Sequence, residues 1–175
     1  MDIFKSNTKR TALFIDGANL HASLKALGGE MDYAGLIEWF QHNTNFIRAL
    51  YYTAVTEGDD YSSLRPLLDW LQYNGFQMVT KPVKEFENGA GEITRKGNMD
   101  VELVLGAMNL APHIDVAVIF SGDGDFKALV EELQRKGKIV VVVSTMVTTA
   151  DELRRQCDVF LELKEFTNLV RRSRE

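Results

Sequence analysis

Four aspartates have the type and placement needed to bind a metal ion: Asp16, Asp100, Asp123 and Asp125. Asp16 directly follows an apolar run, and Asp123 and Asp125 lie in a turn after another such run. Carboxylates that converge without a cation repel one another and raise one another's pKa values, whereas Mg²⁺ and Mn²⁺ prefer oxygen ligands. Such an ion can bind a scissile phosphate, orient water and stabilise the leaving oxygen. The chemistry that best suits this set is therefore hydrolysis of phosphodiester bonds.

Asp100 carries the single charge on an otherwise apolar helical stripe. Helical spacing puts it above the apolar residues Val104, Ala107, Met108 and Ala111. Because burying an unpaired charge is costly, a cation or strong hydrogen bonds are expected beside it. Glu102 lies about 200° around the helix and is assigned to another face.

Each candidate also has a structural interpretation. Asp16 or Asp123 could be an ordinary turn residue, and Asp125 could cap the following helix, bind metal or do both. A structural role and a contact with substrate both stay open for the three candidate substrate-binding residues, Lys96, Asn19 and Ser121.

The elements that would position these residues can be predicted from hydrophobic patterning. Apolar runs suited to buried strands occur at 12–15, 47–55, 76–79, 116–120, 139–143 and, more weakly, 159–163. Helical spacing marks 20–27, 64–73, 99–111 and 126–133, and Gly75 and Gly137 lie where helices should end. This alternation predicts one α/β domain with a mainly parallel sheet covered on both faces. With strand order 3-2-1-4-5, Asp16 and Asp123 would share the crevice where the order reverses.

Boundaries follow from composition. We expect a polar N-terminal extension at 1–10, the domain at 11–165 and a charged C-terminal tail at 166–175. The segment 81–97, which contains Pro82 and Asn88-Gly89, is predicted to be a loop.

Charge and composition exclude several classes of protein. A formal charge of −5 argues against nonspecific coating of nucleic acid but not against an enzyme that acts on it. His21, His42 and His113 lack zinc-ligand spacing, so a zinc enzyme is not expected. The single cysteine, Cys157, allows no internal disulfide, and there is no apolar run long enough for a membrane span or a signal peptide. We therefore expect a cytoplasmic protein that does not associate with membranes.

Three motifs together resemble the NYN domain family, and more closely its LabA-like branch within the PIN-like nuclease superfamily. They are FIDGANL at 14–20, KGNMDV at 96–101 and SGDGDF at 121–126. The resemblance extends over roughly residues 10–165. It implies a three-layer α/β/α, Rossmann-like fold and an acidic Mg²⁺ or Mn²⁺ site that cleaves RNA. The metal-binding and catalytic residues would be Asp16, Asp100, Asp123 and Asp125, with Asn19 and Ser121 supporting them. The resemblance also makes a homodimer plausible.

Gly106 departs from the pattern of this branch, whose members often have an aspartate there. Glycine inside a helix costs about 0.5–1 kcal/mol relative to alanine. Either close packing excludes a side chain, or a useful acid has been lost. On the second hypothesis, Gly106→Asp should preserve folding and increase activity at limiting magnesium. Together with the negative net charge, Gly106 also favours the alternative of a catalytically weak, RNA-binding or regulatory NYN module.

Two other enzyme classes fit less well. A phosphatase of the haloacid dehalogenase type needs a second aspartate two residues after the first, where this chain has Ala18. A nicotinamide cofactor is not expected, because no complete G-x-G-x-x-G follows the first strand.

Overall fold

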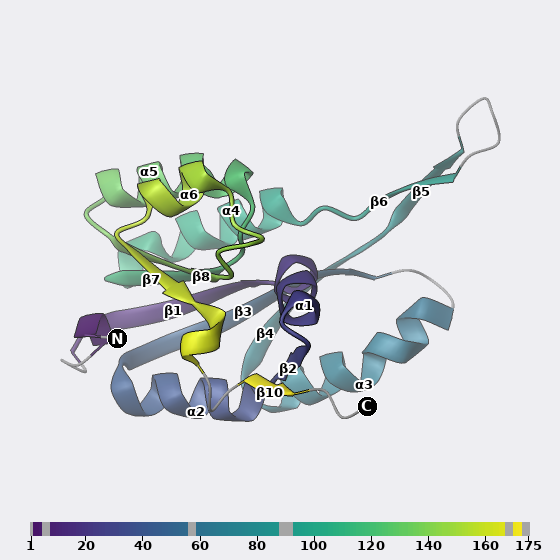
Figure 1. Ribbon diagram of the computed structural model, residues 1–175, viewed down its shortest axis with the longest axis horizontal. Coiled ribbons are helices and arrows are strands. Elements are labelled where there is room, and N and C mark those ends of the chain that lie inside the picture. The colour runs from purple at the N-terminus through teal and green to yellow at the C-terminus, as the bar shows by residue number, and fades with distance from the viewer. Residues whose placement is uncertain (1, 5–7, 56–58, 88–92, 167–169, 173–175) are drawn as a thin grey trace.

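The computed structural model describes residues 2–4, 8–55, 59–87, 93–166 and 170–172, with side chains at 3–4, 8–55, 64–83 and 97–166. Its centre is a six-stranded parallel sheet in the order β4-β3-β1-β7-β8-β9 (Figure 1). The strands are β1 (Arg10–Asp16), β3 (Asn45–Val55), β4 (Phe76–Pro82), β7 (Val116–Phe120), β8 (Ile139–Ser144) and β9 (Val159–Glu162). The predicted order is confirmed, with the weaker sixth run added as β9.

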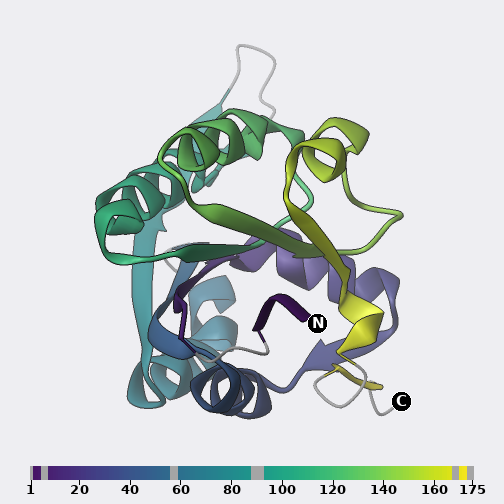
Figure 2. The same cartoon turned by 90° about the vertical axis from the view of Figure 1, so that its left-hand side faces the viewer.

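Helices cover both faces of the sheet, as Figure 2 shows. One layer contains α1 (Gly17–Ala26), α2 (Tyr33–Asn43) and α3 (Asp59–Tyr73), and the other contains α4 (Asp100–Leu110), α5 (Lys127–Arg135) and α6 (Asp151–Gln156). Because side chains alternate along a strand, Leu13 and Ile15 of β1 pack toward the first layer, and Ala12 and Phe14 toward the second. The three-layer α/β/α fold is therefore confirmed.

Short elements complete the chain. In the described part of the chain, 3-10 turns occur at η1 (Asp2–Phe4), η2 (Ala111–His113), η3 (Gly124–Phe126) and η4 (Leu163–Glu165). The remaining strands are β2 (Gly29–Met31), β5 (Lys84–Glu87), β6 (Ile93–Lys96) and β10 (Val170–Arg172). Gly75 and Gly137 follow α3 and α5 with positive φ angles of 90° and 73°, as their predicted positions at helix ends require.

The predicted loop at 81–97 is wrong for most of its length. β5 and β6 form an antiparallel hairpin that projects away from the central sheet (Figure 1). Its sequences, KEFE and ITRK, mix charged residues with isolated apolar ones, so no apolar run marks them as strands. The turn residues Asn88-Gly89 lie outside the described residues.

Both end segments contact the domain. Phe4 is 4% exposed and packs edge-on against Trp39 and Phe40 of α2. At the other end, Val170 of β10 pairs with Met31 of β2 in an antiparallel ladder. The extension and tail boundaries at 10 and 165 stay predictions, although part of each segment is structured. Within the described ranges, no helix is both long enough and apolar enough to cross a lipid bilayer.

Candidate metal centre

A depression of about 380 Å³ lies at the carboxyl edge of the sheet, beside the reversal of strand order at β1 and β7. Asp16 reaches it from the end of β1, Asp123 from the turn after β7, and Asp100 from the first residue of α4. Open parallel sheets bind their ligands at this edge. The fold thus brings three of the four predicted acids to one cavity.

Asp100, Asp123 and Asp125 form a group with the spacing of metal ligands. Each offers one carboxylate oxygen, and these three oxygens all lie within 4.8 Å of one another. Asp125 is exposed and the other two are partly buried. Oxygen ligands lie about 2.0–2.6 Å from Mg²⁺ or Ca²⁺, so two ligands of one ion are at most about 5 Å apart. The group therefore fits a hard divalent cation and contains no histidine or cysteine.

Asp16 is not part of this group and is held as the N-cap of α1. Its Oδ1 accepts a hydrogen bond from the backbone N–H of Asn19 at 3.1 Å, and its Oδ2 accepts one from Ser121 Oγ at 3.2 Å. Burial raises the pKa of Asp16, and the charges of Asp100 and Asp123 raise it further, against the effect of the two hydrogen bonds. The charge of Asp16 therefore interacts with the charges of the group, while both of its carboxylate oxygens accept hydrogen bonds from the protein.

Asn19 and Ser121 tie the two strand ends together. Asn19 Oδ1 accepts a hydrogen bond from the backbone N–H of Gly122 at 2.8 Å. Ser121 is buried, and its Oγ both donates to Asp16 and accepts from the N–H of Asp123 at 3.2 Å. These contacts position the acids, so the structural interpretation holds for both residues, whereas substrate contact stays a prediction.

Asp123, rather than Asp125, caps the turn that follows β7. Asp123 Oδ1 accepts a hydrogen bond from the N–H of Asp125 at 3.0 Å and so begins η3. The N-cap of α5 is Phe126, which makes no capping bond through its side chain. The capping role considered for Asp125 is therefore wrong. Its exposed carboxylate belongs to the acidic group instead.

Asn98 is a member of the site that sequence reasoning missed. Its Oδ1 accepts a hydrogen bond from the N–H of Asp100 at 2.7 Å, and its Nδ2 donates to Asp100 Oδ2. Burial raises the pKa of Asp100, and the charges of Asp123 and Asp125 add to this, while the bond from Asn98 and the charge of Lys81 oppose it. Asparagine two residues before an acid at a helix start was the available signal.

Lys81 of β4, whose charge lowers the pKa of Asp100, forms an ion pair with Glu102 of α4. Its Nζ lies 2.9 Å from Glu102 Oε2, and this contact lowers the pKa of Glu102. Glu102 thus faces Lys81 and does not belong to the acidic group, as its helical phase predicted. Lys96 ends β6, and its side chain lies outside the described residues.

Gly106 faces Tyr52 across the α4–sheet interface. A Cβ atom at position 106 would lie 2.0 Å from Tyr52 Oη, so close packing accounts for the glycine. A side chain at position 106 would require the Tyr52 ring to shift, and Tyr52 is only 1% exposed, so Gly106→Asp should destabilise the fold.

Comparisons with known proteins agree with this architecture. A family model for the NYN domain matches residues 10–164. The low amplitude and bright protein LabA of Synechococcus elongatus is 30% identical over 168 residues, which cover 94% of this chain and 89% of that protein. A crystal structure of a Vibrio parahaemolyticus protein of unknown function superposes with a TM-score of 0.78 at 25% identity and covers 94% of this chain and 97% of the other.

Proposed function

Because the chain belongs to the NYN domain family, we propose that it is a divalent-metal-dependent nuclease that hydrolyses phosphodiester bonds in RNA. The observation that carries this proposal is the group of Asp100, Asp123 and Asp125, whose oxygens lie within 4.8 Å of one another. This group lies at the carboxyl edge of the sheet, where α/β proteins bind ligands. The family supports the nuclease class, and RNA is the substrate that we propose.

The donor set indicates which ion would bind. Mg²⁺ or Mn²⁺ held by these carboxylates would neutralise their repulsion and polarise the scissile phosphate. Asp16 lines the same cavity and has a raised pKa, so it is placed to accept a proton from the attacking water. Through their hydrogen bonds, Ser121 and Asn19 would hold the Asp16 carboxylate and the turn that contains Asp123 in fixed positions during the reaction.

Substrate would enter over the segment between β6 and α4. Gly97 and Asn98 line the cavity directly after Lys96. We therefore retain Lys96 as a proposed phosphate contact, with its positive charge offsetting the four aspartates. Lys81 is a weaker candidate, because Glu102 already neutralises it.

One observation favours a second function, a NYN module that binds metal or RNA without efficient turnover. Both oxygens of Asp16 are bonded within the protein, and Asp16 stands outside the group with ligand spacing. If a working nuclease needs Asp16 to move toward the ion, a rigid N-cap would hold activity low.

Single-turnover cleavage of end-labelled RNA separates the two functions. The nuclease should cut with Mg²⁺ or Mn²⁺ and not with EDTA, and Asp123→Asn should lose at least about a hundredfold in rate. A mass-resolved digest would then give the cut position and the chemistry of the ends. RNA binding without metal-dependent cleavage across structured and unstructured substrates would support the binding module instead.

A further inference from the structure

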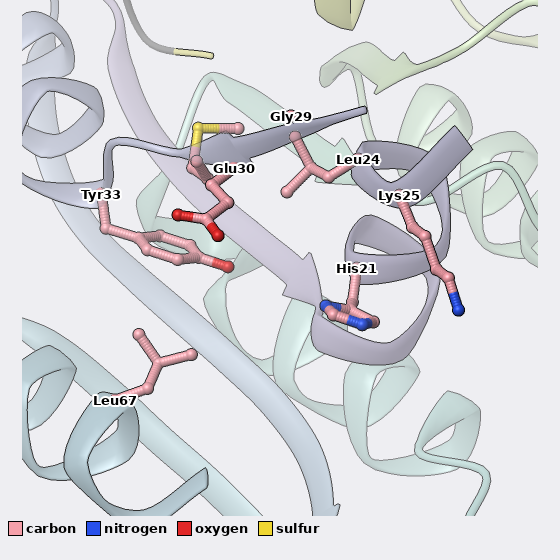
Figure 3. Close-up of a pocket in the computed structure, with 8 residues that line it drawn as sticks. His21, Leu24, Lys25, Gly29, Glu30, Tyr33 and Leu67 are labelled. Atoms are coloured by element: carbon pink, nitrogen blue, oxygen red, sulfur yellow. The ribbon is translucent and has the colours of Figure 1, made fainter. Parts of the chain in front are cut away.

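A second cavity, of about 350 Å³, lies between α1, β2 and α3 (Figure 3). His21 and Lys25 line it from α1, Glu30 and Met31 from β2, Tyr33 from the start of α2, and Leu67 from α3. Figure 3 shows the Tyr33 ring between Glu30 and Leu67, with its hydroxyl directed toward His21. The volume falls in the range of small-ligand pockets, which are typically about 300–1,000 Å³.

Helix α1 separates this cavity from the metal centre. Ala18 and Ala22 line the metal cavity, whereas His21 and Lys25 line the second one, and all four side chains are exposed. Residues three and four apart share a helix face, so these four form one surface stripe. Because the side chain of alanine is a single methyl group, an extended RNA strand that passes from one cavity to the other can lie close to the surface of α1.

A buried tyrosine, Tyr51, lies between Tyr33 of the second cavity and the start of α1. The hydroxyl oxygens of Tyr33 and Tyr51 lie 3.5 Å apart. The Tyr51 ring packs against Gly17, where a Cβ atom would lie 2.7 Å from it, directly beside the N-cap Asp16. Tyr51 therefore contacts Tyr33 at one cavity and packs beside the residue that follows Asp16, which lines the other.

The lining offers different chemistry on its two sides. On one side, Tyr33 is partly buried and is fixed by edge-to-face contacts with Tyr51 and Phe76, at centroid distances of 5.8 and 5.9 Å. A fixed aromatic ring is a surface on which an unstacked base can stack. On the other side, the side chains of His21 and Lys25 offer N–H donors for a phosphate.

We propose that this cavity holds the nucleotide next to the scissile phosphate of a single-stranded RNA. The base packs against Tyr33 between Met31 and Leu67, and its backbone phosphate contacts His21 and Lys25. The carboxylate of Glu30 sets the orientation, since it repels a phosphate and accepts hydrogen bonds from base N–H groups. This inference rests on the proposed function and deepens it by naming a substrate subsite.

The test measures binding without hydrolysis. A fluorescein-labelled single-stranded RNA of about seven nucleotides is titrated in EDTA, which keeps it intact under the proposed mechanism. Replacing both proposed phosphate donors, His21→Ala with Lys25→Ala, should weaken binding at least about fivefold. It should also lower the slope of log affinity against log salt by about 0.7 for each phosphate that the protein no longer neutralises. Because both residues are exposed, the variant should keep the wild-type melting temperature.

The matched control removes the same two residue types at the opposite edge of the sheet. His42 lies in the last turn of α2, before β3, and Lys136 follows α5, before β8. His42→Ala with Lys136→Ala should therefore leave affinity and salt slope unchanged. A second measurement uses the wild-type protein: RNA carrying 5-iodouridine should photo-crosslink to the peptide that contains Tyr33. Equal affinity and slope in the two variants, or crosslinks confined to residues outside the cavity, would overturn the subsite.

Failure of the subsite and failure of the proposed function give different results. Bis(p-nitrophenyl) phosphate is small enough to occupy the metal centre alone, so its Mn²⁺-dependent hydrolysis should be equal in wild type and in His21→Ala with Lys25→Ala. No hydrolysis by any of these proteins would reject the nuclease, whereas normal hydrolysis with unchanged RNA binding would reject only the subsite.

Discussion

The hydroxyl oxygen of Tyr52 lies 2.0 Å from the position that a Cβ atom on Gly106 would occupy. Among the described side chains, this hydroxyl is also the one buried polar group without a hydrogen-bond partner. Tyr52 comes from β3 and lines the metal cavity, and α4 approaches the sheet closely at Gly106, six residues after Asp100. The position of the Tyr52 ring thus explains the glycine, and replacing Gly106 should lower the free energy of unfolding.

The first prediction concerns this pair. Gly106→Ala should destabilise the protein by about 1–3 kcal/mol through overpacking, although alanine favours the helix. Tyr52→Phe should be neutral or stabilising, because it removes a buried hydroxyl that lacks a partner. In the Tyr52→Phe background the nearest ring atom is 3.2 Å from the added Cβ, so Gly106→Ala should cost less. Urea unfolding of the four proteins measures the coupling, and strictly additive effects would contradict the contact.

The second prediction concerns the charge of Asp100 in the protein without metal. The pKa of Asp100 is raised in the folded protein, so protonation of this carboxylate stabilises the folded state. This stabilisation is complete below the unfolded pKa of about 3.9 and is lost as pH rises through the folded pKa. Asp100→Asn should therefore raise the melting temperature of the metal-free protein at pH 7 and change it little near pH 3.

The same variant should respond weakly to metal. Mn²⁺ should raise the melting temperature of wild type more than that of Asp100→Asn, because binding stabilises only the folded state that holds the ion. Asp69→Asn is the control, since Asp69 forms a surface pair with Arg65 in α3, away from the site. A metal-free Asp100→Asn that melts below wild type at pH 7 would argue against repulsion among the acids.

A third prediction concerns the link between the strand ends. Asn19→Ala removes the acceptor of the Gly122 N–H and should lower Mn²⁺ affinity about 10- to 100-fold, the range found when residues that orient ligands are replaced. Titration calorimetry measures this. Asn43→Ala, which loses a bond from Asn43 Nδ2 to the Trp39 carbonyl at the end of α2, is the control. Equal affinities in the two variants would mean that the Asp123 turn holds its shape without Asn19.

Much of the fold could be predicted because buried parallel strands have a strong signature. Continuous apolar runs located each strand of the central sheet, and the order 3-2-1-4-5 correctly placed Asp16 beside Asp123. Helix α2 was not predicted although Leu36, Ile37 and Phe40 have helical spacing. The β5–β6 hairpin has no apolar run to reveal it, because it projects from the domain.

The detail of the site depends on contacts that spacing alone does not determine. The positions of Asp100 and Asp123 follow from the ends of their elements. Asp16 is held by hydrogen bonds to Asn19 and to Ser121 of another strand end, and the fit of Gly106 depends on the Tyr52 ring from β3. Asn98 was missed because its role depends on the backbone conformation just before α4.

We propose that RNA cleavage requires an ion held by Asp100, Asp123 and Asp125. The most direct test measures Mn²⁺ binding by electron paramagnetic resonance and single-turnover cleavage of RNA on the same samples, over one Mn²⁺ titration. We expect the cleavage rate to rise in proportion to the occupied sites. Asp123→Asn should lose both binding and cleavage while its melting temperature shows that it is folded. Cleavage that persists in EDTA, or that Asp123→Asn retains at the wild-type rate, would show that the ion is not required.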